Sequence, residues 1–111
     1  MSHSGVGAHN SPLLKEIERR GGGYVWEDDI FAVHLMDVSL QPDDVPLLTG
    51  LIGVKEIYVD AANMGLPEMK AFASIPGLEH LGIARWVPGD GEFESILKLC
   101  EGARLIPDAE L

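Results

Sequence analysis

The stretch VKEIYVDAANMGLPEMKAFASIPGLEHLGI, residues 54–83, decides the fold class. Ile57-Tyr58-Val59 alternates with period two, which predicts a strand. After a loop, Pro67-Glu68 opens a segment with apolar residues every three positions, which predicts a helix with one buried stripe. Pro76-Gly77 ends that helix, and Leu81-Gly82-Ile83 begins a second alternating strand. Strand, loop and helix therefore form one unit.

The same unit recurs along most of the chain at a spacing of 24 residues. From Ile30 onward, the same eight offsets are apolar in three successive rows, with Pro88 the only strained position. The rows are Ile30, Val33, Leu35, Val38, Leu40, Val45, Leu48 and Leu51; Val54, Ile57, Val59, Ala62, Met64, Met69, Phe72 and Ile75; and Leu78, Leu81, Ile83, Trp86, Pro88, Phe93, Ile96 and Leu99, with Gly102, Leu105 and Pro107 beginning a fourth. A unit this short cannot bury its own apolar face, so neighbouring units must stack. We therefore expect an α/β fold: a short right-handed βα solenoid with parallel strands on one face and helices on the other.

The 111 residues divide into three segments of a single domain. Residues 1–11 have no cationic start followed by an apolar run, so we expect a disordered leader without a secretory signal. Residues 12–29 predict an N-terminal cap made of a helix, with Ser11 as its N-cap and Pro12 as its first residue, and a hairpin. Residues 30–111 form the solenoid.

The strand pattern Val54-x-x-Ile57-x-Val59-x-x-Ala62-x-Met64, repeated from Leu78 to Trp86, resembles the leucine-rich repeat family. The resemblance covers residues 30 to about 107. The family commonly has Asn, Cys or Thr where this chain has Val38, Ala62 and Trp86. We therefore expect the loops after the strands to satisfy their backbone groups in another way.

Composition excludes several function classes. Eighteen acidic residues against eight Lys and Arg give a formal charge of -10, which repels nucleic acid and anionic membranes. The lone cysteine, Cys100, favours a reducing compartment, so we expect a cytoplasmic protein. No transmembrane run, catalytic motif or cofactor fingerprint is visible in the sequence, and we expect neither a cofactor nor enzymatic activity.

The resemblance implies that the outward residues of the strands form a concave face that binds another protein. The expected columns on this face are Ala32, Glu56, His80 and Arg104; His34, Tyr58, Gly82 and Ile106; and Met36, Asp60, Ala84 and Asp108. Tyr58 lies at the centre with charged neighbours, a composition typical of binding hot spots. The expected partner-binding residues are His34, Glu56, Tyr58, Asp60, His80 and Arg104. An ordinary solvated sheet face is the alternative.

Three further surfaces remain open as hypotheses. Trp86 either fills the core or anchors a partner from its loop. Residues 21–54 hold no Lys or Arg, and their acids either steer a basic partner or cap helices. Those acids are Glu27, Asp28, Asp29, Asp37, Asp43 and Asp44. The last strand, Arg104 to Pro107, is an open edge at which a second copy would associate.

Two other function classes compete with the binding module. Residues 58–66, YVDAANMGL, faintly resemble a STAS domain, a bacterial regulatory fold that carries a phosphorylatable Ser in this loop; here Ala62 and Asn63 stand there instead. A small hydrolase or metal enzyme on the concave face would use His34, Asp60 and His80. Strand order distinguishes the solenoid from the STAS-like regulator, because a uniform parallel ladder fits the solenoid and reordered strands fit the regulator.

Overall fold

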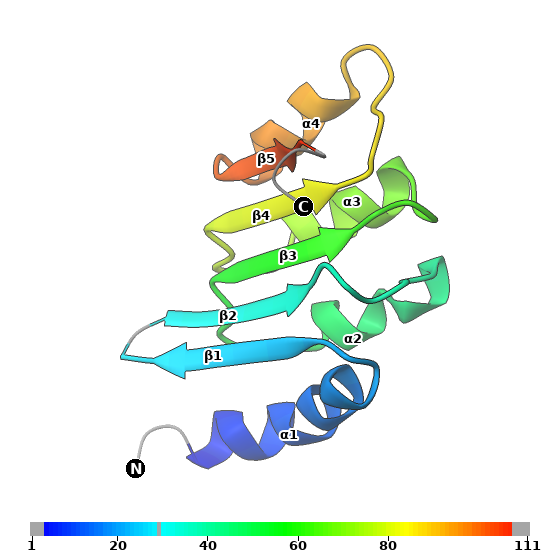
Figure 1. The fold of residues 1–111 in the computed structure, drawn as a ribbon. Helices are drawn as coiled ribbons and strands as arrows, with labels where there is room; N and C mark the ends of the chain where they lie inside the picture. Colours follow the sequence, from blue (N-terminus) through cyan, green and yellow to red (C-terminus); the bar gives the residue numbers. More distant parts are fainter. Residues whose placement is uncertain (1–3, 29, 108–111) are drawn as a thin grey trace.

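The computed structural model describes residues 4–28 and 30–107, which form an α/β fold with one five-stranded sheet (Figure 1). The elements in chain order are α1 (Ser4–Arg19), β1 (Gly23–Glu27), β2 (Ile30–Leu35), the 3-10 turn η1 (Pro42–Asp44), α2 (Pro46–Thr49), β3 (Glu56–Asp60), α3 (Leu66–Ala73), β4 (His80–Ala84), α4 (Glu92–Leu99) and β5 (Ala103–Ile106). The predicted hairpin is confirmed, since β1 and β2 pair in antiparallel fashion, but its second strand, β2, lies after residue 29, the predicted end of the cap.

The strands lie in sequential order, β1-β2-β3-β4-β5, and β2 to β5 run parallel to one another. Ala32 pairs with Glu56 and Glu56 with His80, so the predicted step of 24 residues holds across these strands. The last step is wrong in the prediction. Leu81 pairs with Ala103, a step of 22, because the connection after α4 comprises only residues 100–102, whereas residues 74–79 follow α3.

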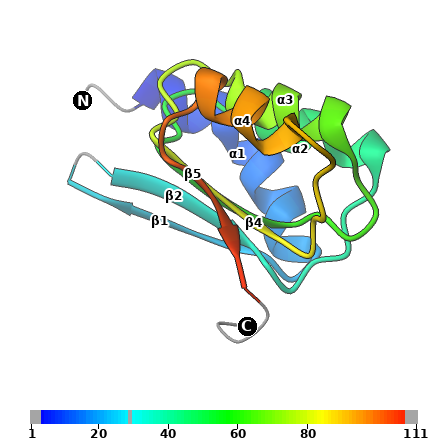
Figure 2. The same cartoon turned by 90° about the horizontal axis from the view of Figure 1, so that it is seen from above.

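All four helices lie on one face of the sheet (Figure 2). The inward side chains of β2 to β4 are fully buried against them, and so are Leu48 of α2 and Met69 and Phe72 of α3; Val45, the first residue of the predicted α2 stripe, is only partly buried. These core residues are Phe31, Val33, Leu35, Ile57, Val59, Leu81, Ile83, Leu48, Met69 and Phe72. In α4, Ile96 is buried as predicted, but Leu99 is 48% exposed, because no described helix covers the outer side of this last helix.

The helix starts repeat in hydrogen bonding as well as in sequence. A carboxylate oxygen accepts a hydrogen bond from the backbone N–H three residues before it: Asp44 from Gln41 (2.8 Å), Glu68 from Gly65 (2.7 Å) and Glu92 from Gly89 (2.8 Å). The three pairs are 24 residues apart. Gln41 and Gly65 are helix N-cap residues, so these two bonds satisfy donors that a helix N-terminus leaves without a partner, whereas Gly89 lies two residues before Gly91, the N-cap of α4.

Helix α1 begins at Ser4 and not at Pro12, so the prediction of a leader ending at residue 11 is wrong for residues 4–11. Tertiary contacts outweigh the start signal at Ser11-Pro12. The side chain of Asn10 is fully buried; its Nδ2 donates to the Ile52 carbonyl and its Oδ1 accepts from the Ile52 N–H, both at 2.9 Å. His9 Nε2 donates to the Gly50 carbonyl at 3.0 Å. These bonds fix the first half of α1 to the loop after α2.

The loops after the strands satisfy their backbone by individual bonds in place of a polar ladder. Val38 and Trp86 are buried, but Ala62 is exposed and its neighbour Ala61 is buried instead. The Ala61 N–H donates to the Ala84 carbonyl at 2.8 Å, and Asp60 Oδ1 accepts from the Ala62 N–H at 3.0 Å. The expectation that these loops use other partners is confirmed.

Candidate functional site

The face of the sheet opposite the helices carries all six residues expected to bind a partner. Strand alternation places them there, since their neighbours along each strand point into the core. The set is His34, Glu56, Tyr58, Asp60, His80 and Arg104. Between them lie small residues, Ala32, Gly82 and Ala84, that leave room for larger neighbours. We call these residues together the open face.

Tyr58 is fixed in place at the centre of the open face. The His34 ring stacks on its ring with centroids 4.8 Å apart and an interplanar angle of 11°. The Tyr58 hydroxyl donates to Glu56 Oε1 at 2.6 Å. This hydrogen bond, together with partial burial and the negative charge of Glu56, raises the pKa of the Tyr58 phenol, while Arg104 opposes the rise. The phenol is therefore neutral at physiological pH and held as a donor.

Gly82 provides the space that the Tyr58 ring occupies. The two residues face each other across β3 and β4, and a Cβ on Gly82 would lie 2.6 Å from Tyr58 Cδ1. It would also lie 2.8 Å from Ile106 Cδ1. A side chain at this position would displace the ring. Strand alternation alone predicts Gly82 on this face, but only the cross-strand register reveals this role.

Arg104 lies beside this cluster because of the shorter last step of the sheet. It pairs with Gly82 and therefore belongs to the column of His34 and Tyr58. The prediction that it belongs to the column of His80 is wrong. Ile106 likewise pairs with Ala84. Asp108, the fourth member of the predicted third column, lies outside the described residues.

Asp60 forms an ion pair that the sequence did not predict. Its Oδ2 lies 2.6 Å from Nη1 of Arg85, the residue directly after β4. Arg85 has a backbone φ of +60°, a left-handed conformation that non-glycine residues rarely adopt. The ion pair and the cap on Ala62 hold Asp60 at the carboxyl end of the open face.

The two histidines of the hydrolase hypothesis lie far apart. His80 pairs with Glu56 in one column, while His34 lies in the next column with Tyr58, so β3 separates them. Within residues 4–28 and 30–107, no three His, Cys, Asp or Glu side chains are placed to hold one.

The other candidate residues do not gather into a site. Trp86 is mostly buried in the core cluster, whereas Val87 beside it is 92% exposed. Cys100 is buried, which raises the pKa of its thiol. The acids of residues 21–54 are dispersed: Glu27 and Asp28 precede β2, Asp37 follows it, Asp43 and Asp44 lie in η1, and Asp29 lies outside the described residues. Asp44 caps the 3-10 turn η1, as the capping interpretation predicted. It also pairs with Arg20 at 2.6 Å.

No protein-family model, curated protein or solved structure matches the chain. Among the described helices, none has the length and apolar character needed to cross a bilayer.

Proposed function

We propose that the protein is a non-enzymatic binding module, or a small subunit of a complex, that binds another protein through its open face. The observation that carries this proposal is the Tyr58 cluster. A tyrosine held by the His34 ring and by Glu56 loses little conformational freedom when a partner covers it, and rigid aromatic side chains dominate binding energies at protein interfaces.

The charges around Tyr58 define the kind of surface a partner must match. Glu56 and Asp60 are acidic and Arg104 is basic. Arg104 lies in the column of Tyr58, and Glu56 and Asp60 lie in the columns on either side of it. Mixed charges at an interface fix the register and orientation of the bound partner more than they raise its affinity. A partner protein with hydrogen-bond acceptors and complementary charges fits this surface better than an apolar ligand does.

We also propose that the fold is a short leucine-rich-repeat-like right-handed solenoid. Its support is the sequential strand order, the step of 24 residues between β2, β3 and β4, and the recurrence of the capping carboxylates at the same spacing. The STAS-like regulatory alternative expects reordered strands. Sequential order favours the solenoid. With its lone buried cysteine, such a module suits the cytoplasm.

Affinity capture from native lysate, read by mass spectrometry, tests the function. The wild type is compared with a Tyr58→Ala, Asp60→Ala double variant of the open face and with a Lys70→Ala, Glu94→Ala double variant whose exposed residues lie on α3 and α4. Circular dichroism confirms that all three fold. We expect the wild type and the helix variant to retain a protein that the open-face variant loses.

Two outcomes would contradict the proposal. Capture that survives in the open-face variant but fails in the helix variant would transfer the binding surface to the helices. Failure of all three proteins to retain any partner would leave the Tyr58 cluster as an ordinary solvated sheet face.

A further inference from the structure

The helical layer extends one position beyond the sheet at its β1 end. Helix α1 contacts β1 and α2 and lies past β1 on the side away from β2 (Figures 1 and 2). No strand of the described chain pairs with the outer edge of β1. Part of α1 therefore packs against no strand of the described sheet.

Side-chain exposure follows from this missing strand. The inward residues of β2, β3 and β4 are at most 2% exposed. Tyr24 and Trp26 also face inward, because they pair with Val33 and Phe31 and contact the Phe31 ring. Yet Tyr24 is 39% exposed and Trp26 is only partly buried. The core is thus incompletely covered at β1.

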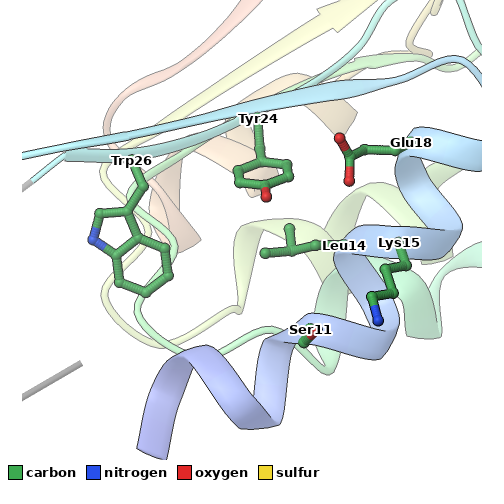
Figure 3. Close-up of a pocket in the computed structure, with 6 residues that line it drawn as sticks. All are labelled: Ser11, Leu14, Lys15, Glu18, Tyr24 and Trp26. Carbon is green, nitrogen blue, oxygen red and sulfur yellow. The ribbon is translucent and has the colours of Figure 1, made fainter. Parts of the chain in front are cut away.

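A hollow of about 270 Å³ opens between α1 and β1 (Figure 3). Leu14, Tyr24 and Trp26 form its apolar part, and Ser11, Lys15 and Glu18 complete its lining from α1. The hollow is smaller than the roughly 300–1,000 Å³ of typical small-molecule sites. Its size suits an inserted side chain better than a whole ligand.

The edge above this hollow lacks the features that usually prevent strand addition. Strand β1, with the sequence GYVWE, contains no Lys and no Pro, and Val25 on its other face is 44% exposed. At the opposite edge, β5 carries Arg104 and is followed by Pro107, residue types that blunt an edge strand. Strand addition is therefore better supported at β1 than at β5.

Charge selects the occupant of this edge. Glu27 and Asp28 lie at the end of β1, and residues 21–54 contain no Lys or Arg; in the hollow itself Glu18 is balanced by Lys15. A second copy of the chain would bring another net charge of -10 against this acidic hairpin. A basic segment is attracted to the same place.

We propose that the edge of β1 and the hollow beneath it bind an extended basic segment of a partner protein. The segment would add to the sheet as a sixth strand, place an apolar side chain in the hollow between Leu14 and Trp26, and direct Lys or Arg side chains of its other face toward Glu27. This mode derives affinity from main-chain hydrogen bonds and specificity from alternate side chains. It uses a surface separate from the open face.

A fluorescein-labelled peptide of seven residues that alternates lysine with valine or leucine serves as the probe, and fluorescence anisotropy measures its binding. Ser11→Phe fills the hollow, and Glu27→Lys reverses a charge on the face of β1 that the lysines share. We expect each change to weaken binding at least tenfold. Hydrogen exchange of the wild-type complex should show new protection in β1. Circular dichroism verifies folding, and Glu27→Lys tests the proposal independently if Ser11→Phe fails to fold.

Matched controls separate strand addition from general attraction to an acidic protein. Glu94→Lys makes the same charge change on α4, away from the hollow, and should leave the affinity within twofold. A peptide with N-methylated alternate amides should lose binding, because it cannot complete the strand. The Tyr58→Ala, Asp60→Ala variant should bind the peptide normally, so this proposal and the open-face proposal fail separately.

Several results would overturn the proposal. Equal weakening by Glu94→Lys and Glu27→Lys would mean diffuse electrostatic attraction, and retention of the N-methylated peptide would exclude strand pairing. Loss of peptide binding through stable dimerisation at β1, seen by sedimentation, would assign the edge to a second copy.

Discussion

Asn10 binds the first half of α1 to the loop after α2. Its amide pairs with both the N–H and the carbonyl of Ile52, as a neighbouring strand would. Replacement by alanine leaves both backbone groups without their partner in a partly buried place. We expect Asn10→Ala to lower the free energy of unfolding by about 1–3 kcal/mol. Urea denaturation measures this loss.

Asn63 supplies the matched control for Asn10. It is exposed, and its Nδ2 donates to Ser39 Oγ at 3.2 Å. We expect Asn63→Ala to change the free energy of unfolding by less than about 0.5 kcal/mol. Equal losses for the two variants would show that the burial of Asn10 adds nothing to stability.

Gly82 and Gly23 occupy the same column of the open face but differ in their surroundings. A Cβ at Gly82 would overlap the Tyr58 ring, whereas a Cβ at Gly23 meets nothing within 4 Å. We expect Gly82→Ala to destabilise the protein by about 1–3 kcal/mol and Gly23→Ala to be neutral or stabilising. The cost of Gly82→Ala should fall in a Tyr58→Ala background. A thermal-unfolding mutant cycle tests this coupling, which an unchanged cost would refute.

At the scale of elements, carboxylates hold the end of α1. Glu16 accepts hydrogen bonds from Arg19 and Arg20, and these bonds lower its pKa to about 2. Arg20 also pairs with Asp44, whose pKa is lowered chiefly by the hydrogen bond from the Gln41 N–H. The same side chains therefore connect α1 to η1.

These lowered pKa values give stability a defined pH dependence. The Glu16 pKa in the unfolded chain is about 4.3, so its contribution is fully present above that pH and is lost as the pH falls toward 2. We expect stability to fall less steeply between pH 4.5 and 2 in Glu16→Gln than in the wild type. Glu94→Gln, the same change on α4, controls for loss of one acid. Parallel curves for Glu16→Gln and the wild type would contradict this role.

The repeated elements could be predicted from sequence, and the two ends could not. Local hydrophobic pattern and capping determine the strands containing Ile57 and Leu81 and the helix start at Glu68. These signals recur in the sequence every 24 residues. The start of α1 depends instead on the contact between Asn10 and Ile52, which are 42 residues apart. The column of Arg104 depends on a last step of 22 residues in place of 24, and no local signal marks that change.

The same distinction applies to the open face. Period-two alternation was enough to place His34, Tyr58 and Glu56 on one side of the sheet. The stacked ring, the short hydroxyl bond and the role of Gly82 required the cross-strand register. The ion pair between Asp60 and Arg85 depends on a left-handed backbone conformation at Arg85, directly after β4. An arginine in the sequence does not predict that conformation.

At the scale of the whole molecule, contacts run mainly between neighbours along the chain. Each strand pairs with the next, and α1 contacts α2, α2 contacts α3, and α3 contacts α4. Stability in such an array is approximately the sum of unit terms and nearest-neighbour interfaces. Damage at one end should therefore remain local, whereas damage at the centre should spread to both sides.

Hydrogen exchange in two variants that truncate buried side chains tests this expectation. Ile106, in β5, lies on the open face beside Gly82 and is 8% exposed, whereas Ile57, in β3, is fully buried in the core. We expect Ile106→Ala to speed exchange in β5 and α4 while the amides of α1 and β1 keep their protection. Ile57→Ala should cost about 2–5 kcal/mol and speed exchange throughout, because β3 lies at the centre of the sheet. If Ile106→Ala instead lowered protection equally in α1 and β5, the chain would unfold as one cooperative unit, and the additive description of its repeats would be wrong.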